Sequence, residues 1–272
     1  MTNAFLNTLT KICADKMEHV GRNEHLIPSI VHSERAKTKP QPAGFCAAIR
    51  NRKEYGSPAL IAEVKKASPS KGIIRPNFDA AKIAMAYQQG GATCVSVLTD
   101  MPYFKGCDDD LEAVKSVIRL PVIRKDFILT SYQIIESRAL GADCILLIVA
   151  ALDDETLQRF YNEAVDLGMD VLVEIHNEIE LDRALSITPM MIGVNARNLK
   201  TLTVDLATSF DLVQKIPSTI LRIAESGIST HEELTTLYKA GYDGFLVGES
   251  LIRQDDITLA TEILLGKPME SA

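Results

Sequence analysis

The sequence predicts an α/β protein whose main unit is a closed (β/α)8 barrel, a TIM barrel, with a helical N-terminal extension. From Pro58 onward, short apolar runs rich in β-branched residues alternate with amphipathic segments, and the alternation repeats through eight units. A chain of 272 residues also has the length at which such a barrel forms one unit. An open, doubly wound sheet is the competing interpretation, and it usually carries a Gly-rich turn after its first strand. No G-x-G-x-x-G follows the first run, so the barrel is favoured.

Eight short runs are expected to form the barrel strands. They are Ala59–Lys65, Thr93–Leu98, Val122–Asp126, Cys144–Val149, Val171–Ile175, Met191–Asn195, Ile220–Glu225 and Gly244–Val247. Between and after these runs, apolar residues recur at helical spacing. The expected helices are Asp79–Gln89, Asp108–Ile118, Ser131–Leu140, Asp153–Leu167, Glu178–Leu185, Asp205–Lys215, Thr230–Ala240 and Asp255–Leu264.

Cap signals support several of these helices. Gly-containing tripeptides follow four of them, and Gly just past a helix is the usual left-handed cap. The tripeptides begin at Gly90, Gly141, Gly168 and Gly241. Expected N-caps are Thr130 or Ser131, Asp153 and Thr230, and Thr230 with Glu233 fits a capping box.

Residues 1–50 differ from the rest and are expected to form a helical extension packed on a catalytic barrel of residues 51–272. Apolar residues recur at helical spacing between Phe5 and Met17, which predicts a first amphipathic helix. A second helix is expected near Ile30–Thr38, and Pro40 and Pro42 are interpreted as breakers after it. The regular spacing of the apolar residues favours helices over a disordered arm.

Composition and charge argue against several function classes. The formal net charge is −7 and no long basic block is present, so no nucleic-acid partner is expected. The five cysteines are widely spaced, form no C-x-x-C, and are interpreted as reduced thiols of a cytoplasmic protein. No signal-type apolar run and no stretch of membrane-spanning length is found, so no membrane contact is expected. The sequence does not fix the oligomeric state, and a monomer is the working expectation.

Charged residues end several of the expected strands, where a barrel of this kind carries its active site. Lys65, Lys125, Glu174 and Glu225 come from alternate strands, which supply one interior layer of such a barrel. Alternation along the first run turns Glu63 to the same face as Lys65. A solvated strand end is the plain alternative for any one of them. Four equivalent positions instead favour an acid/base site, because unpaired buried ions are strongly destabilising.

Two Gly-containing turns after the last strands suggest a phosphate site. Glu225-Ser226-Gly227-Ile228 follows the seventh run, and Val247-Gly248-Glu249-Ser250 follows the eighth and opens onto a short helix. Backbone N–H groups at these two places hold phosphate in many barrels. Ser68, in the loop after the first run, could add a hydroxyl. A tight turn without a ligand is the alternative for each glycine taken alone.

Other residues give weaker signals. His176 follows a strand, and a hydrogen-bonded loop histidine is a sufficient explanation for it. The run Asp108–Asp110 resembles a metal-binding cluster, but it opens a helix, where acidic residues favour the helix dipole. Cys94 and Cys144 lie within expected strands and are interpreted as core residues. Phe104 and Phe127 fit either an aromatic substrate pocket or packing at its rim.

Six segments together resemble the indole-3-glycerol phosphate synthase family. They occur in the family's order, and the N-terminal helical extension also looks like the family's. The segments are Ile61–Ser70, Val122–Phe127, Leu172–His176, Ile192–Leu199, Ile223–Ile228 and Leu246–Leu251. The set is specific, because barrels in general do not share all six. Ala196 is a small departure, since many relatives are expected to have Asn there.

The resemblance implies a substrate and a reaction. The substrate would be 1-(2-carboxyphenylamino)-1-deoxy-D-ribulose 5-phosphate, and the products indole-3-glycerol phosphate, carbon dioxide and water, in tryptophan biosynthesis. Loss of carbon dioxide and recovery of aromaticity drive such a ring closure. The resemblance therefore implies a carboxy-lyase with no metal and no organic cofactor.

The resemblance also implies roles for individual residues. Lys125 would be the acid near the ribulose carbonyl, Lys65 would pair with the anthranilate carboxylate, and Glu174 would act as an acid/base group. We expect Lys125 to dominate ring closure. Orientation of the lysines and substrate would fall to Glu63, Asn195 and Glu225. Substrate and phosphate contacts would come from Ser68, Ser226, Gly227, Gly248, Glu249, Ser250, Phe127 and Arg197.

Three rival functions stay open at this point. A phosphoribosylanthranilate isomerase is a related phosphate-binding barrel, but its chemistry favours a Cys base after the first strand, where this chain has Glu63 and Lys65. A Schiff-base aldolase could use either Lys65 or Lys125. A ligand-binding barrel without catalysis is the third.

Overall fold

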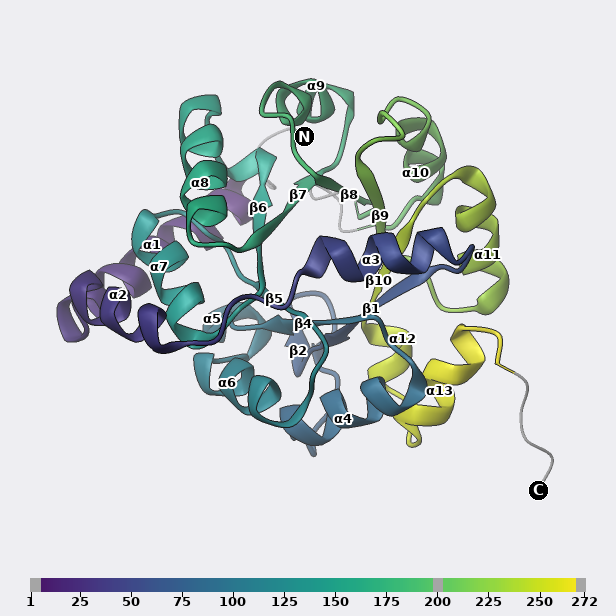
Figure 1. Cartoon of the computed structure of the whole chain (residues 1–272), viewed down its shortest axis with the longest axis horizontal. Helices are drawn as coiled ribbons and strands as arrows, with labels where there is room; N and C mark the ends of the chain where they lie inside the picture. The colour runs from purple at the N-terminus through teal and green to yellow at the C-terminus, as the bar shows by residue number, and fades with distance from the viewer. Residues whose placement is uncertain (1–5, 198–202, 268–272) are drawn as a thin grey trace.

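The computed structural model describes residues 6–197 and 203–267 (Figure 1). Eight parallel strands close into a barrel, in the order β1-β10-β9-β8-β7-β6-β5-β4. This confirms the predicted fold class, and each strand boundary lies within one residue of the expected run. The strands are β1 (Ala59–Val64), β4 (Cys94–Leu98), β5 (Val122–Lys125), β6 (Cys144–Ile148), β7 (Asp170–Ile175), β8 (Met191–Asn195), β9 (Leu221–Glu225) and β10 (Gly244–Val247).

Helices surround the barrel, and every expected helix between the strands is present. They are α4 (Ala80–Gly90), α6 (Asp108–Val117), α7 (Ser131–Leu140), α8 (Asp154–Asp166), α9 (Glu178–Ser186), α10 (Leu206–Val213), α11 (His231–Ala240) and α13 (Ile257–Leu264). Short elements add to the loops, and only the last of them was expected. They are β2 (Ala67–Ser68), β3 (Gly72–Ile73), α5 (Met101–Phe104), the 3-10 turn η1 (Val149–Ala151) and α12 (Glu249–Ile252).

Alternation along each strand divides the apolar residues between two clusters. On β1, Leu60, Ala62 and Val64 belong to the outer cluster between the strands and the helices. Ile61 belongs to the inner cluster that fills the barrel, and Glu63 follows it on the same face. The alternation expected for this strand is therefore confirmed, and the inward face ends in a buried charge.

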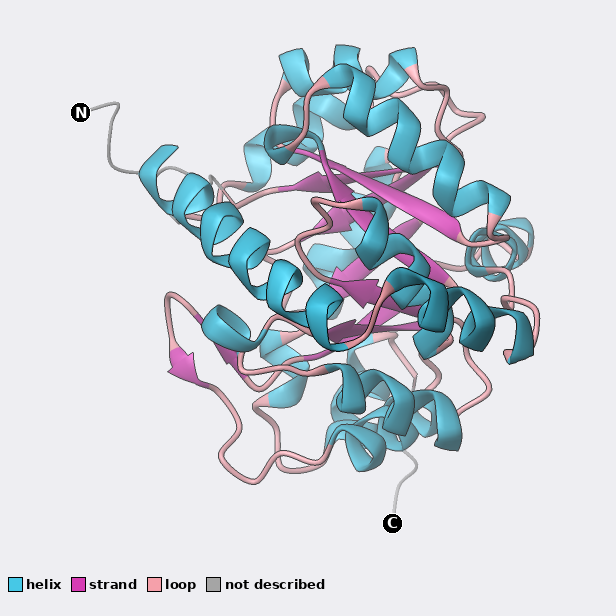
Figure 2. Ribbon diagram, turned by 90° about the vertical axis from the view of Figure 1, so that its left-hand side faces the viewer, coloured by secondary structure: helices cyan, strands magenta, loops and turns pink. Residues whose placement is uncertain are grey.

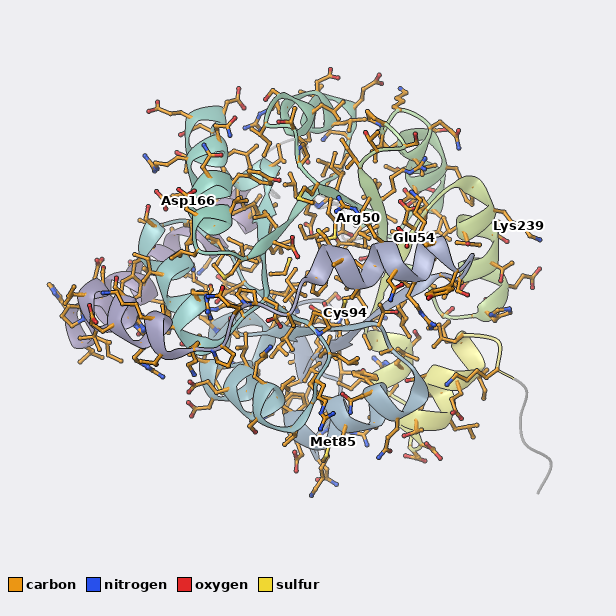
Figure 3. All side chains as sticks on the ribbon, viewed as in Figure 1. Arg50, Glu54, Met85, Cys94, Asp166 and Lys239 are labelled. Atoms are coloured by element: carbon orange, nitrogen blue, oxygen red, sulfur yellow. The ribbon has the colours of Figure 1, made fainter. Side chains whose placement is uncertain are left out.

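Helix α3 (Phe45–Glu54) closes the end of the barrel where the strands begin, and it was not expected from the sequence. Phe45, Cys46 and Ile49 are fully buried in the inner cluster. Cys94 Sγ lies 3.9 Å from the Phe45 carbonyl oxygen, which places the helix start against β4. Figure 3 shows α3 crossing this end of the barrel, with two of its residues labelled. The helix starts directly after Gly44, which occupies the N-cap position with a positive φ of 74°.

Two further helices, α1 (Leu6–Leu26) and α2 (Ser29–Thr38), lie on the outside of the barrel. Both elements were expected, although α1 continues well past Met17, and Phe5 lies outside the described residues. Figure 1 shows α1 and α2 beside α7, and Figure 2 shows the long α1 slanting across the barrel wall. In Figure 2 the barrel strands run toward the side on which the β2–β3 hairpin projects.

The expected helix caps are largely present. Asp153 accepts a hydrogen bond from the Thr156 N–H, and Thr230 forms the full capping box with Glu233. Thr130 is the N-cap of α7 with the extended backbone of that position, as expected, but its hydroxyl makes no cap hydrogen bond among the described residues. Within the described ranges, no helix combines the length and apolar character that a membrane-spanning helix needs.

The packing of α3 leads to a stability prediction. Ile49→Ala removes a fully buried side chain from the inner cluster, and we expect it to lower the free energy of unfolding by about 2–5 kcal/mol. Chemical denaturation with urea measures this as a lower midpoint with an unchanged slope. The control is Ile179→Ala, which truncates a 75% exposed isoleucine of α9 and should change stability by less than about 0.5 kcal/mol. Equal effects of the two substitutions would contradict the account of α3.

Candidate active site

A buried cluster of charges lies where the strands end. The Lys125 ammonium, at the end of β5, lies 2.6 Å from Glu225 Oε2, 3.6 Å from Glu174 Oε2 and 3.9 Å from Glu63 Oε2. All three carboxylates are buried, and they come from β9, β7 and β1. One ammonium therefore holds three carboxylates from alternate strands, which are supported from below by the apolar barrel core.

The sequence analysis assigned Lys65 to the same interior layer as Lys125, Glu174 and Glu225, and the structure shows that this assignment is wrong. Lys65 was counted in the layer, but the member contributed by the first strand is Glu63. Lys65 lies farther along the chain and reaches back to Glu63 Oε1 at 2.5 Å. Strands of a closed barrel are staggered, so a position counted from the end of each run does not give its height in the barrel. Lys65 thus joins the site as the ion-pair partner of Glu63, and the layer itself consists of Lys125, Glu63, Glu174 and Glu225.

Two glycines make room for the buried carboxylates. A Cβ atom on Gly193 of β8 would lie 2.1 Å from Glu225 Oε1, and one on Gly248 would lie 2.5 Å from Glu63 Oε1. Any other residue at either position would displace a member of the charged layer. The requirement at these positions is therefore space for a neighbouring side chain, in addition to any backbone contact with a ligand.

The environment pushes the pKa values of two neighbouring carboxyls apart. Burial raises the pKa of Glu225, Lys125 opposes the rise, and the like charge of Glu174 adds to it, so the pKa lies above its usual range. Burial also acts to raise the pKa of Glu174, but His176 and Lys125 outweigh it and lower the pKa below its usual range. Carboxyls separated in this way are suited to different acid and base roles.

The same contacts keep the central lysine charged. Burial acts to lower the pKa of Lys125, but Glu225, Glu174 and Glu63 together outweigh it and raise the pKa above its usual range. For Glu63, burial acts to raise the pKa, and Lys65 and Lys125 outweigh it and lower the pKa. Lys125 is therefore an ammonium at neutral pH, able to donate a proton or stabilise negative charge.

The loops after β1, β9 and β10 hold the residues that the sequence assigned to phosphate. Ser68 Oγ is buried and has no hydrogen-bond partner among the described residues. Ser250 Oγ donates to the Ile228 carbonyl oxygen at 3.0 Å, which joins the turn containing Gly227 to the turn containing Gly248. The Glu249 carboxylate pairs with Arg253, 3.0 Å distant.

The predicted residues after β8 and β9 form a second small group. Ser226 Oγ donates to Asn195 Oδ1 at 2.8 Å, and the Arg197 N–H donates to the same oxygen at 3.0 Å. Ser226 has a positive φ of 68°, an uncommon conformation for a non-glycine residue that holds its side chain toward Asn195. Arg197 pairs with Val204 across the base of the next loop. Asn198 and Leu199, which belong to the segment used for the resemblance, lie outside the described residues.

Two aromatic residues lie at the edge of the site. The ring centroids of Phe127 and Phe104 are 6.4 Å apart, and Phe127 also packs against the inner cluster. The two rings come from the loop after β5 and from α5. Their contact supports the packing interpretation made from the sequence, and a role in a substrate pocket stays a prediction.

The structure adds residues that sequence reasoning did not place in the site. His176 lies 3.3 Å from Glu174 and 3.0 Å from Glu180, where the sequence suggested only a loop histidine. Lys16 of α1 is almost fully buried and lies 2.8 Å from Asp100 and 2.7 Å from Asp126. The four-residue spacing of His176 and Glu180 could have predicted their contact from the sequence. Nothing in the sequence indicated the partners of Lys16.

The acidic run at the start of α6 has a structural role. Asp108 forms a 2.8 Å ion pair with the buried Arg124, and Asp110 completes a capping box with Cys107. The described residues contain no group of three or more His, Cys, Asp or Glu side chains arranged to hold a metal ion. Cys94 and Cys144 are fully buried in the inner cluster, as expected for core residues.

Comparison with solved structures shows the fold. The thiamine phosphate pyrophosphorylase from Pyrococcus furiosus aligns with a TM-score of 0.57 and 16% identity, over 76% of this chain and 93% of that chain. The N-acetylmannosamine-6-phosphate 2-epimerase from Clostridium perfringens aligns with a TM-score of 0.58 and 19% identity, over 74% and 90%. At these identities the likeness is one of architecture.

Sequence comparison shows the family. The indole-3-glycerol phosphate synthase family model matches residues 9–264. The chain is 49% identical over 259 residues to the indole-3-glycerol phosphate synthase of Azospirillum brasilense, covering 95% of this chain and 99% of that protein. It is 48% identical to that of Rhizorhabdus wittichii, over 95% and 98% of the two chains. The chain therefore belongs to the indole-3-glycerol phosphate synthase family.

Proposed function

We propose that this chain is an indole-3-glycerol phosphate synthase, a carboxy-lyase of tryptophan biosynthesis. It converts 1-(2-carboxyphenylamino)-1-deoxy-D-ribulose 5-phosphate to indole-3-glycerol phosphate, carbon dioxide and water. The observation that carries the proposal is the buried Lys125 ammonium among three carboxylates at the carboxyl end of the barrel. An acid, a base and charge stabilisation in one dry site are what this condensation needs.

Ring closure is assigned to Lys125. The aromatic carbon that carries the carboxylate attacks the ribulose carbonyl, and negative charge develops on the carbonyl oxygen. A lysine kept protonated by its neighbours can stabilise that oxygen and transfer a proton to it. Glu225, 2.6 Å away, orients the ammonium, and its Oε1 has no hydrogen-bond partner among the described residues.

Lys65 is assigned to the carboxylate end of the substrate. Its side chain is 15% exposed and is held by Glu63 alone among the charged members of the site. It can turn toward an incoming carboxylate without breaking up the central layer. After carbon dioxide leaves, the remaining hydroxyl departs as water. Lys65 can donate a proton to this hydroxyl, while the ionised Glu174 accepts the proton lost from carbon.

The phosphate end is assigned to the loops after β1, β9 and β10. Backbone N–H groups at Gly227, Gly248 and Glu249 and the hydroxyl of Ser68 are the proposed donors. The unpaired, buried Ser68 Oγ supports this assignment, because buried hydroxyls are normally hydrogen-bonded. Asn195, Ser226 and Arg197 would contact the chain between the two ends of the substrate, and Phe127 would cover its aromatic ring.

The remaining features of the enzyme follow from the same proposal. The helical extension of residues 1–50 and the barrel of residues 51–272 form one catalytic unit, without metal or organic cofactor in the reaction. The partner is the phosphorylated small molecule, with no role for nucleic acid or membrane. Five free cysteines agree with a cytoplasmic location, and a monomer suffices because the proposed site residues come from one chain.

The rival chemistries have less support. A Schiff-base lysine needs a neutral amine, and hence a lowered pKa, whereas the pKa of Lys125 is raised by three carboxylates. An isomerase using a cysteine base finds no thiol in the charged cluster, because Cys94 and Cys144 are buried in the apolar interior. The family relationship and the central lysine therefore favour the synthase.

The division of labour between the lysines can be tested by alanine substitution. We expect Lys125→Ala to lower kcat by roughly 10²–10⁴-fold, because it removes the acid for ring closure. Lys65→Ala should raise KM through loss of the carboxylate contact, and it should lower kcat by less than Lys125→Ala does, through loss of the proton donor for dehydration. Product formation is followed by the fluorescence of indole-3-glycerol phosphate, with the exposed Lys239→Ala as the matched control. Near-normal turnover of Lys125→Ala beside an inactive Lys65→Ala would reverse the assignment.

The phosphate site can be tested at Gly248. Inorganic phosphate should inhibit competitively. Gly248→Ala should raise its inhibition constant at least roughly tenfold, because the new Cβ, 3.0 Å from Glu63 Cβ, forces the turn and its backbone N–H to shift. The kcat should also fall, because the new Cβ would lie 2.5 Å from Glu63 Oε1. Gly21→Ala is the control, since a Cβ there meets nothing within 4 Å. Unchanged inhibition by phosphate in Gly248→Ala would place the phosphate elsewhere.

A further inference from the structure

His176 stands between two carboxylates behind the charged layer. Its Nε2 lies 3.3 Å from Glu174 Oε1, and its Nδ1 lies 3.0 Å from Glu180 Oε2. The side chain is only 8% exposed, and Glu174 is fully buried beside it. Lys125 approaches the other oxygen of the same carboxylate, at 3.6 Å from Oε2. Glu174 is thus held from two sides, by one cation at each oxygen.

The outer carboxylate is itself fixed. Glu180 Oε2 accepts the backbone N–H of His176 at 2.8 Å, and Glu180 Oε1 accepts the side-chain amide of Asn177 at 2.6 Å. The Asn177 side chain in turn caps the start of α9 by accepting the Glu180 N–H at 3.0 Å. Four hydrogen bonds therefore join Glu180, Asn177 and His176 into a rigid corner, and the imidazole ring has one orientation available.

The chemistry of the contacts sets the charge of the ring. Ionised carboxylates only accept hydrogen bonds, whereas a neutral imidazole has a single N–H donor. Nδ1 hydrogen-bonds to Glu180, whereas Nε2 lies at ion-pair distance from Glu174, 3.3 Å, without hydrogen-bond geometry. Both contacts are attractive at once only when both ring nitrogens carry protons. A neutral His176 would leave one carboxylate facing the lone pair of a ring nitrogen. The surroundings of His176 therefore stabilise the protonated ring, the imidazolium.

We infer that His176 is a positioning residue for the proposed reaction: held by Glu180, its imidazolium pairs with Glu174 and keeps that carboxylate ionised and aimed at the substrate. This inference rests on the proposed function, because it assigns a role to Glu174 as the base. His176 does not face the pocket as a proton donor, since Glu174 stands between it and Lys125.

The charged groups around the ring agree with this role. Glu174 lies on β7, which ends just before His176, and Glu180 faces the ring from α9. Beyond Glu174 come Lys125 from β5 and Glu225 from β9. Burial acts to lower the pKa of His176, but Glu174 and Glu180 outweigh it and raise the pKa to about 9. The ring therefore keeps its charge at neutral pH and loses it only in alkaline solution.

The first test measures the ring in the substrate-free enzyme and does not depend on activity. The imidazole NMR signal that disappears in His176→Gln should titrate in the wild type near pH 9, well above the ordinary value of about 6.5. Glu180→Gln should lower that value, because one of the two acceptors loses its charge. Titration at or below the ordinary value, or no response to Glu180→Gln, would overturn the inference.

The second test uses kcat at saturating substrate in two variants that differ in one donor. His176→Asn keeps an amide near the Nδ1 position only, whereas His176→Gln keeps one near the Nε2 position that serves Glu174. We expect His176→Asn to lose kcat by roughly 10²-fold with KM nearly unchanged, as for a misplaced catalytic group. His176→Gln should retain clearly more activity. In both variants the acid limb of the pH profile should move to higher pH, because Glu174 loses its cationic neighbour.

The outcomes separate this inference from the function on which it rests. A wild-type enzyme that forms no indole-3-glycerol phosphate refutes the proposed function, whereas an active wild type with unaffected His176 variants refutes the inference alone. Equal losses of kcat in the Asn and Gln variants with an unmoved acid limb would show a purely structural role and also overturn it. His25→Gln, on the exposed end of α1, is the matched control and should leave kcat and the profile unchanged.

Discussion

The site depends on one buried ammonium that holds three carboxylates together. Without Lys125, the carboxylates of Glu63, Glu174 and Glu225 would repel one another in a place that water reaches poorly, and such a layer would not stay ionised. With it, the negative charge is shared unequally, so that Glu174 is a carboxylate while Glu225 holds a proton more readily. The proposed acid and base roles of these carboxyls therefore follow from one geometry. The glycines at 193 and 248 leave room for that geometry.

Much of this arrangement could be predicted from the sequence. The period of two along each strand gave the inward face of β1, and the charges at the ends of alternate strands gave the site. The height of each residue in the barrel could not be predicted, because it depends on the stagger of the strands. For that reason Glu63, and not Lys65, completes the layer. Helix α3 was missed because its burial depends on a barrel end that only the closed fold creates.

The long-range contacts of α1 were the other feature beyond sequence reasoning. Lys16 is 2% exposed and bridges Asp100 and Asp126, which follow β4 and β5. Asp126 is next in sequence to Lys125 and also accepts a hydrogen bond from Thr99 at 2.7 Å. The buried ion pair between Lys16 and Asp126 thus links α1 to the segment that carries Lys125. Removal of such a charge leaves uncompensated buried carboxylates, so the extension and the site are energetically linked.

A crystal structure of the enzyme with a substrate analogue, reduced from ketone to alcohol at the ribulose carbonyl, tests the central claim most directly. The account predicts that Lys125 Nζ lies within hydrogen-bonding distance of the new hydroxyl oxygen while keeping its contact with Glu225. It also predicts the phosphate against the backbone of Gly227 and Gly248, and the carboxylate against Lys65. A complex in which Lys65 contacts that hydroxyl and Lys125 contacts only its three glutamates would contradict the account.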